Sequence, residues 1–319
     1  MKKYIFTVIC LMLAATLLTA CSDGNTATSG NGKLKIVTTI FPEYDWVREI
    51  AGEKADITML LNNGVDLHSY QPTVDDIVKI SDCDMFLYVG GESDKWVQDA
   101  LAEAVNKKMV VINLLEILGD AAKEEEITEG MESEDEEYAE YDEHVWLSLR
   151  NAEIFCKEIA NKLSEIDSKN AGYYLQNSTE YIEKLRNLDA KYRETAENAD
   201  VKTLIFGDRF PFRYMVDDYG ISYYAAFAGC GAETEASFET VIFLANKTDE
   251  LGLNAIMQTE SSDGAVARTV KENTISKSQK ILTLDSMQSI TSSDVENGVT
   301  YLSLTEKNLE VLKEALEPR

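Results

Sequence analysis

The chain has 319 residues and is strongly acidic, with 57 aspartate and glutamate residues against 30 lysine and arginine residues and a formal net charge of −27. A surface of this sign argues against nucleic acid and against anionic membrane surfaces as electrostatic partners. The length suggests two domains, each with its own core.

The first twenty residues have the pattern of a secretory signal peptide. Two lysines follow Met1, the run 4–18 is almost wholly apolar, and small residues precede Cys21. The run is too short and wrongly flanked for a stable transmembrane helix. We therefore expect residues 1–20 to be a signal peptide. Residues 21–33, rich in glycine, serine, threonine and asparagine, should be a flexible tether.

The cysteines predict a lipid anchor and no disulfide framework. Cys21, placed directly after small residues, resembles the lipobox cysteine of bacterial lipoproteins, which carries the acyl chains. The resemblance implies an extracytoplasmic protein anchored to the outer face of the cell membrane; the alternative is a soluble secreted protein. We expect Cys83 and Cys156 to be small buried residues and Cys230, between two glycines, to be exposed.

Residues 34–148 alternate between apolar β-rich runs and helical patterns, and they predict a first lobe. Nearly continuous apolar strands separated by helices are typical of a parallel sheet covered on both faces. The expected strands are 34–40, 57–61, 85–89 and 109–114, and the expected helices are 44–51, 73–80 and 94–105.

An acidic run spans residues 120–143, with thirteen acidic residues and one basic residue, Lys123. Such a run cannot bury a core, so it predicts a mobile, solvated loop. The alternative is a weak cation-gathering arm next to His144.

Residues 149–199 form one long helical pattern without proline, and residues 200–319 resume the strand–helix alternation. The predicted fold class is α/β: two lobes, each a mostly parallel sheet flanked by helices, joined by one long rigid spine helix. In the second lobe we expect strands at 203–206, 223–227, 254–259 and 280–284, and helices at 211–219, 238–251, 264–273 and 305–316.

The only two histidines, His68 and His144, both lie in loops. Ligands of open α/β sheets bind where strands end and loops converge. His68, Asp208, Glu260 and Asp285 follow predicted strands directly or within a short loop. Two imidazoles with carboxylates, two groups from each lobe, would make a closed site for a divalent transition metal in the cleft between the lobes.

The ligand types narrow the chemistry. Imidazole suits zinc and also manganese or iron, whereas carboxylate oxygens move the preference toward manganese. Four protein ligands fit capture better than catalysis, because a catalytic zinc keeps one position open. The chain contains no GxxxxGK[ST], HExxH or GxSxG motif, so we expect no enzyme of those classes.

Two segments resemble a known family. GVDLHSYQPT (64–73) is similar to the GxDPHxYxPT motif of the metal-binding substrate-binding proteins of bacterial zinc and manganese ABC importers, and EYDEHVWLSL (140–149) is similar to that family's DPHVWLxP. The similarity covers about residues 34–316. It implies a monomer that captures Zn²⁺ first or Mn²⁺ second and delivers it to an ABC permease. His68, His144 and Asp285 would be ligands.

The departures from the family pattern concern the remaining ligand. Leu67 replaces the motif's proline, and Arg209 stands where the family places a histidine or glutamate ligand. A guanidinium cannot coordinate a cation, so Asp208 is the natural substitute; alternatively it pairs with Arg209 or caps the next helix. Glu260 is a ligand, a cap or, as we favour, an acceptor for a histidine N–H.

Two rival functions use the same residues differently. One is a metal-dependent surface hydrolase that employs His68 and His144. The other is an organic-solute receptor or adhesin in which both histidines are incidental.

Overall fold

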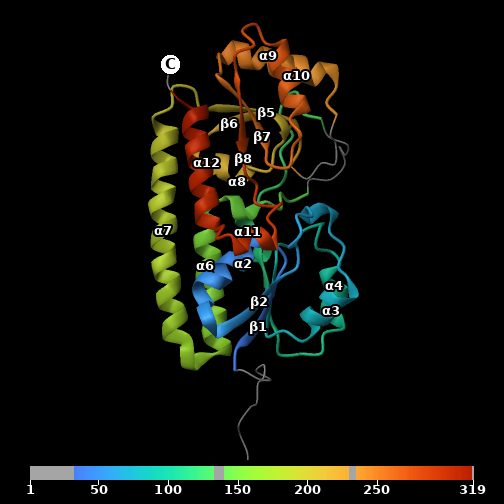
Figure 1. Ribbon diagram of the computed structural model, residues 1–319, viewed down its shortest axis with the longest axis vertical. Coiled ribbons are helices and arrows are strands. Elements are labelled where there is room, and N and C mark those ends of the chain that lie inside the picture. Colours follow the sequence, from blue (N-terminus) through green and yellow to red (C-terminus); the bar gives the residue numbers. More distant parts are fainter. Residues whose placement is uncertain (1–31, 133–139, 230–234, 318–319) are drawn as a thin grey trace, which may run out of the picture.

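The computed structural model describes residues 32–132, 140–229 and 235–317. Figure 1 shows two lobes stacked along the long axis, with three helices on one side. These helices are α6 (Leu149–Ile166), α7 (Ala171–Glu197) and α12 (Tyr301–Ala315). The helix α7 runs past both lobes, α6 lies beside the N-terminal lobe and α12 beside the C-terminal lobe (Figure 1). The predicted signal peptide, the lipid site Cys21, most of the tether and Cys230 lie outside the described residues.

The N-terminal lobe contains a four-stranded, all-parallel sheet with the order β2-β1-β3-β4. Parallel neighbours need crossover connections, and the intervening helices supply them. Its strands are β1 (Leu34–Thr38), β2 (Ala55–Met59), β3 (Met85–Tyr88) and β4 (Val110–Asn113). Its helices are α2 (Phe41–Ala51), α3 (Val74–Ser81), α4 (Val97–Ala102) and α5 (Leu114–Leu118).

The C-terminal lobe repeats this topology with the order β6-β5-β7-β8, again all parallel. The helix α10 packs closely on β5, because a Cβ at Gly207 would lie 2.5 Å from the Cα of Ala267. The strands are β5 (Thr203–Arg209), β6 (Ser222–Phe227), β7 (Ala255–Thr259) and β8 (Lys280–Leu284). The helices are α8 (Arg213–Tyr219), α9 (Phe238–Leu251), α10 (Ala265–Asn273) and α11 (Ser292–Glu296).

The predicted fold class is confirmed, with one correction to the spine. Residues 149–199 are not one helix: α6 ends at Ile166, a 3₁₀ turn follows, and α7 runs back along α6 (Figure 1). Asp167 makes the break, because its carboxylate accepts hydrogen bonds from the Asn170 side chain and the Tyr174 hydroxyl, both at 2.6 Å. Such local side-chain bonding competes with continued helix. The helix that joins the lobes is α7.

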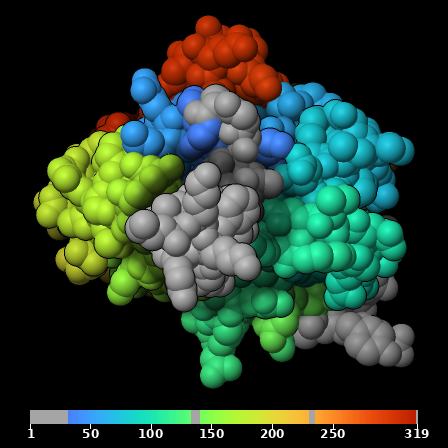
Figure 2. All heavy atoms as spheres, turned by 90° about the horizontal axis from the view of Figure 1, so that it is seen from below, coloured from blue at the N-terminus to red at the C-terminus, as the bar shows by residue number. Residues whose placement is uncertain are grey.

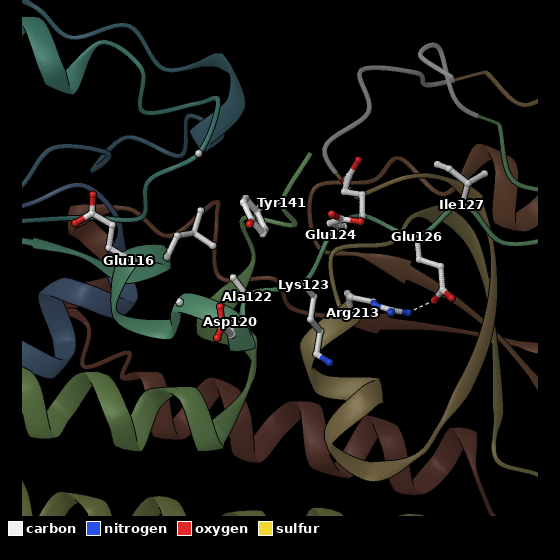
Figure 3. A pocket seen from close by; sticks show the side chains of 13 residues that line it. Glu116, Asp120, Ala122, Lys123, Glu124, Glu126, Ile127, Tyr141 and Arg213 are labelled. Atoms are coloured by element: carbon white, nitrogen blue, oxygen red, sulfur yellow. Dashed lines mark hydrogen bonds and ion pairs between the residues drawn. The ribbon is translucent and has the colours of Figure 1, made fainter. Parts of the chain in front are cut away.

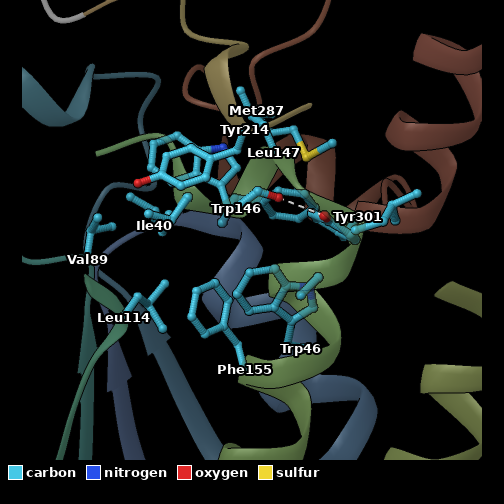
Figure 4. Packing of buried hydrophobic residues seen from close by; sticks show 14 of the residues in the cluster. Ile40, Trp46, Val89, Leu114, Trp146, Leu147, Phe155, Tyr214, Met287 and Tyr301 are labelled. Atoms are coloured by element: carbon cyan, nitrogen blue, oxygen red, sulfur yellow. Dashed lines mark hydrogen bonds between the residues drawn. The ribbon is translucent and has the colours of Figure 1, made fainter. Parts of the chain in front are cut away.

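One aromatic cluster fills the space where the lobes meet. Trp46 lies 5.6 Å from Phe155 and 5.2 Å from Tyr301, measured between ring centroids. The Tyr301 hydroxyl donates to the Trp146 carbonyl at 2.7 Å, as the dashed line in Figure 4 shows. Burying a large side chain contributes roughly 1.5–3 kcal/mol, so this cluster ties the two lobes into one structure.

Backbone contacts add to that tie. Asn63 and Thr291 form an isolated antiparallel bridge, and the Ser292 N–H donates to the Asn62 carbonyl at 2.8 Å.

In the end view of Figure 2, the turn between α6 and α7 and the side carrying α3 and α4 lie on opposite flanks of the N-terminal lobe. Among the described helices, none combines the length and the apolar character that crossing a membrane requires.

Candidate metal centre

His68 is held by a short turn at the carboxyl end of the N-terminal sheet. Asp66 caps this 3₁₀ turn, Leu67–Ser69, by accepting a hydrogen bond from the His68 backbone N–H at 2.9 Å. Leu67, which replaces the motif's proline, is 1% exposed and anchors the turn in the core. The imidazole of His68 retains a small exposed fraction of 15%.

His144 lies in a fully buried position next to the aromatic cluster. Its backbone N–H and its ring Nδ1 both contact Oδ1 of Asp142, at 2.8 and 2.9 Å. The ring packs on Trp146 with 5.2 Å between centroids. On the other side, a Cβ at Gly229 would lie 3.3 Å from the ring's Cε1, so the imidazole is clamped between the two lobes.

The two imidazoles point their Nε2 atoms at one another, 3.3 Å apart. Each Nδ1 already has a polar partner: Ser93 Oγ lies 2.9 Å from that of His68, and Asp142 occupies that of His144. Histidines that bind metals through Nε2 are oriented in this way by acceptors at Nδ1. The geometry therefore offers two converging nitrogen ligands to one cation.

The protonation of the pair is set by burial and by nearby charge. Burial and then the neighbouring His144 lower the pKa of His68, so this imidazole is neutral at pH 7. Burial also opposes charge on His144, but the carboxylate of Asp142 outweighs it and the net pKa of His144 is raised. One proton can therefore reside between the rings, and a cation bound at both Nε2 atoms would displace it.

Sequence reasoning missed the groups that support His68. Oε2 of Glu143 lies 3.4 Å from its Nδ1, and Oε1 accepts from the Ser93 backbone N–H at 2.9 Å. Glu143 is only 2% exposed, and burial raises the pKa of its carboxyl. The available signal was the position of Glu143 directly before His144, in a run that we interpreted as a solvated loop.

Asp285 lies on a loop that contacts Trp146, and it does not join the histidine pair. Its Oδ1 accepts from the Met287 backbone N–H at 2.8 Å. Burial, followed by the charge of Glu260, raises the pKa of Asp285 to about 6. The next residue, Ser286, accepts a hydrogen bond at its carbonyl from the indole of Trp146 at 2.9 Å, which places the Asp285 loop against the residue that packs on His144.

Glu260 does not accept from a histidine, contrary to the interpretation that we favoured. Its two oxygens accept from the Ser286 N–H at 2.7 Å, the Ser286 hydroxyl at 2.8 Å and the Ser289 hydroxyl at 3.1 Å. The sequence could not show this, because both serines lie 26 or more positions along the chain. Glu260 therefore orders the loop that carries Asp285.

Asp208 cross-links the second sheet. Oδ2 accepts from the Thr259 N–H and hydroxyl, both at 2.7 Å, and Oδ1 accepts from the Arg209 N–H at 2.8 Å. The alternative in which it caps the helix near Pro211 is wrong, and the alternative in which it pairs with Arg209 takes the form of a bond from the Arg209 backbone N–H. Both oxygens have hydrogen-bond donors, so coordination of a metal would compete with the bonds from Thr259 and Arg209.

No third histidine, cysteine, aspartate or glutamate joins the pair in a group that could hold a metal, within residues 32–132, 140–229 and 235–317. The structure thus brings His68 and His144 together and leaves Asp208, Asp285 and Glu260 apart from them. The buried positions expected for Cys83 and Cys156 are confirmed.

The described part of the acidic run is attached to the C-terminal lobe. Lys123 pairs with Asp217 at 2.8 Å, and Glu126 pairs with Arg213, the contact drawn as a dashed line in Figure 3. The Glu132 N–H donates to the Ala226 carbonyl at 2.9 Å. Residues 120–132 and 140–143 therefore do not form the solvated loop without partners that the sequence predicts; positions 133–139 lie outside the described residues.

This segment also lines an open acidic groove of about 1090 Å³ that reaches Gly91 (Figure 3). Its carboxylates come from α5 and from the acidic run: Glu116, Asp120, Glu124, Glu125 and Glu126. Lys123 and Arg213 also line the groove, and the excess of carboxylates would raise the local concentration of cations there.

Comparisons with known proteins agree on one family. The family model of the periplasmic zinc-uptake complex component A, ZnuA, matches residues 36–315. The zinc-binding lipoprotein AdcA of Streptococcus pneumoniae is 31% identical over 320 residues; the match covers 99% of this chain but 62% of that protein's length. The high-affinity zinc uptake protein ZnuA of Bacillus subtilis is 30% identical, with 96% of each chain covered.

A solved structure supports the same relationship. The Zn(II)-bound ZnuA-like domain of Streptococcus pneumoniae AdcA superposes with a TM-score of 0.72 at 29% identity. That alignment covers 90% of this chain and 100% of the domain. The resemblance found in the two histidine motifs is thereby confirmed at the level of the whole fold.

Proposed function

The chain belongs to the family of the periplasmic zinc-uptake complex component A, and from this premise we propose that it captures Zn²⁺ outside the cytoplasm and delivers it to the permease of an ABC importer. The carrying observation is the pair of imidazoles whose Nε2 atoms face each other at 3.3 Å. Zinc binds imidazole nitrogen at about 2.0–2.1 Å with tetrahedral angles, which places two such nitrogens roughly 3.3–3.4 Å apart, so the observed spacing suits two ligands of one ion.

Asp285 is the third ligand in this proposal. It lies on the loop that Trp146 connects to His144. Burial raises the pKa of its carboxyl because it disfavours the charged form, and a bound cation would stabilise that charge. A small movement of this loop would bring its oxygens to the ion. Asp208 is held by two bonds from Thr259, so a shift toward the ion would weaken them, and a water molecule would satisfy the fourth position without that cost.

Zinc is preferred over manganese for two reasons. Both relatives compared above carry zinc in their names, and the two ligands that the fold brings together are nitrogens. Borderline-soft zinc suits imidazole, whereas manganese favours a larger share of oxygen ligands. Manganese would become the better cargo if both Asp208 and Asp285 coordinated it.

The same proposal includes the setting of the protein. Cys21 would carry acyl chains, the tether would extend from the outer face of the membrane, and the protein would act as a monomeric carrier rather than an enzyme. The acidic groove would gather cations. Transfer to the permease would follow from weakening the Asp285 contact.

Competitive titration of the purified protein with zinc and manganese tests the proposal. We expect one tightly bound zinc per chain. Loss of a residue that only supports a ligand lowers metal affinity roughly 10- to 100-fold, and His68→Ala should lower zinc affinity by more than that. Ser69→Ala, an exposed neighbour in the same turn, is the control and should bind zinc normally. No stoichiometric metal would reject the proposal and favour an organic-solute receptor.

A matched pair of alanine variants assigns the remaining ligands. Asp285→Ala should weaken zinc binding strongly. Asp208→Ala should lower the stability of the second sheet, through Thr259, while leaving zinc affinity within a few-fold of wild type. A large loss of affinity in Asp208→Ala, with thermal stability unchanged, would make Asp208 a ligand instead.

A further inference from the structure

Glu143 is a carboxylate within the second histidine motif that contacts the histidine of the first. The segment Asp142-Glu143-His144 stands where the resembling motif reads Asp-Pro-His, and a proline offers no side-chain acceptor. Glu143 is nearly fully buried, and its Oε2 has no hydrogen-bond partner while lying 3.4 Å from Nδ1 of His68. A buried carboxylate oxygen without a partner is costly unless something compensates for it.

The neighbouring loop is shaped to admit this side chain. Gly91 has a φ of +82°, and a Cβ there would lie 2.3 Å from Oε1 of Glu143. Any other residue at position 91 would expel the carboxylate from its place. The Gly90-Gly91 turn therefore leaves room for the Glu143 carboxylate, and Ser93, which follows the turn, donates its backbone N–H to the same carboxylate.

Ser93 connects the carboxylate to the imidazole. Its backbone N–H donates to Oε1 of Glu143 at 2.9 Å, and its hydroxyl oxygen lies 2.9 Å from Nδ1 of His68. A carboxylate oxygen can only accept, and a hydroxyl oxygen has lone pairs that can accept an imidazole N–H. The set therefore favours a proton on Nδ1 of His68 and a free lone pair on Nε2, the atom that faces His144.

We propose that Glu143, acting directly and through Ser93, is a positioning residue that holds His68 in the tautomer with a metal-binding Nε2. This inference rests on the proposed function for its importance to zinc, but the tautomer itself is a property of the metal-free protein. Asp142 does the same for His144, so each ligand imidazole has its own buried carboxylate at Nδ1. Two such charges also offset the charge of a divalent cation bound between the rings.

The test is Glu143→Gln, which keeps the size of the side chain but turns an amide toward Nδ1. An amide N–H donates to Nδ1 and so favours the opposite tautomer, in which Nε2 carries the proton. Long-range ¹⁵N–¹H correlation spectra of the full chain, which has only two histidines, read both tautomers directly. We expect His68 to shift toward the Nε2–H form, and zinc affinity to fall about 10- to 100-fold.

Glu43→Gln is the matched control. Glu43 is another fully buried glutamate of the N-terminal lobe, and its hydrogen bonds go to Thr39 and Ile40 rather than to a histidine. It should leave the His68 tautomer and the zinc affinity unchanged. Ser93→Ala is the second variant should Glu143→Gln fold poorly, and it should shift the tautomer in the same direction by a smaller amount.

Each outcome separates this inference from the proposed function. An unchanged tautomer and unchanged zinc affinity in Glu143→Gln would overturn the positioning role while leaving zinc capture intact. If Glu143→Gln shifts the His68 tautomer but the wild-type protein binds no zinc, the positioning role is sustained and the proposed function is rejected. Equal losses in Glu143→Gln and Glu43→Gln would show a general effect on folding and overturn the inference.

Discussion

At the start of α2, the side chain of Glu43 is fully buried and accepts three hydrogen bonds. One oxygen receives the Thr39 N–H at 2.9 Å, the Thr39 hydroxyl at 3.1 Å and the Ile40 N–H at 3.3 Å, and the other has no partner. Burial, and then the charge of Asp94, raises the pKa of Glu43 to about 8. Glu43 is therefore mostly protonated in the folded protein at neutral pH.

This predicts a loss of stability as the pH rises. The folded pKa of about 8 exceeds the usual glutamate pKa of 4.5, so the folded state holds the proton over a range where the unfolded chain has lost it. The stability that this proton contributes is fully present below the unfolded pKa of 4.5 and is lost as the pH rises through the folded pKa of about 8. Each pKa unit corresponds to about 1.4 kcal/mol. Between pH 6 and pH 9 the free energy of unfolding of Glu43→Gln should therefore rise by roughly 2 kcal/mol relative to that of wild type.

Urea denaturation of both proteins at the two pH values measures this difference. Glu53→Gln, at an exposed position of the same lobe, should follow the wild-type curve at every pH. A constant gap between Glu43→Gln and wild type would mean that Glu43 does not take up a proton on folding.

At this scale the sequence predicts His68 and His144 well and their partners poorly. Both histidines stand out because they are the only two and because each lies in a loop that follows a strand. Glu143 and Glu260 are acidic residues in acidic surroundings, and nothing local distinguishes a buried carboxylate from a solvated one. Asp208 is held by Thr259, 51 positions away, and such a contact leaves no mark in the local pattern.

Among the elements, α7 carries the link between the lobes. Near its start, the Asn177 side chain donates to the Ile50 carbonyl of α2 at 3.0 Å, and near its end the Tyr192 hydroxyl donates to the Thr305 carbonyl of α12 at 2.7 Å. Leu185, between them, is fully buried. The helix thus packs on both lobes through one continuous face.

Leu185→Ala should therefore destabilise the whole molecule rather than one lobe. Large-to-small changes at buried leucines cost about 2–5 kcal/mol, because they remove contacts and leave a cavity. Lys184→Ala, the exposed neighbour on the same helix, should change stability by less than about 0.5 kcal/mol. Urea unfolding followed by helical signal and by tryptophan fluorescence should shift together; two separated transitions in Leu185→Ala would instead mean that the lobes unfold independently.

The eight strands were predictable because buried parallel strands are short, apolar and rich in β-branched residues, and all eight lie within a few residues of their expected positions. The break between α6 and α7 was missed, although Asp167, Ser168 and Asn170 are residue types that favour turns over helix interiors. What ends α6 is the convergence of Asn170 and Tyr174 on one carboxylate. That arrangement appears only once the turn has formed.

For the molecule as a whole, the contacts between the lobes limit how far they can move. Trp146 donates to the Ser286 carbonyl, Tyr301 donates to the Trp146 carbonyl, and the Tyr301 N–H donates to the buried carboxylate of Asp45 at 2.8 Å. The bridge between Asn63 and Thr291 closes the same side. Hinge closure needs a few residues that are free to rotate, whereas Trp146, Tyr301 and Asp45 are buried and hydrogen-bonded.

Zinc binding should therefore leave the overall dimensions unchanged and act on loops. Small-angle scattering of the chelator-treated protein and of the zinc-loaded protein should give the same radius of gyration and the same distance distribution. Hydrogen exchange should slow near His68 and along the Asp285 loop, because the ion would tie these segments together. His68→Ala with zinc added is the control and should show neither the ion nor the protection. A marked compaction on zinc binding would mean that the Trp146 and Tyr301 contacts open in solution, and that release depends on lobe rotation rather than on the Asp285 loop.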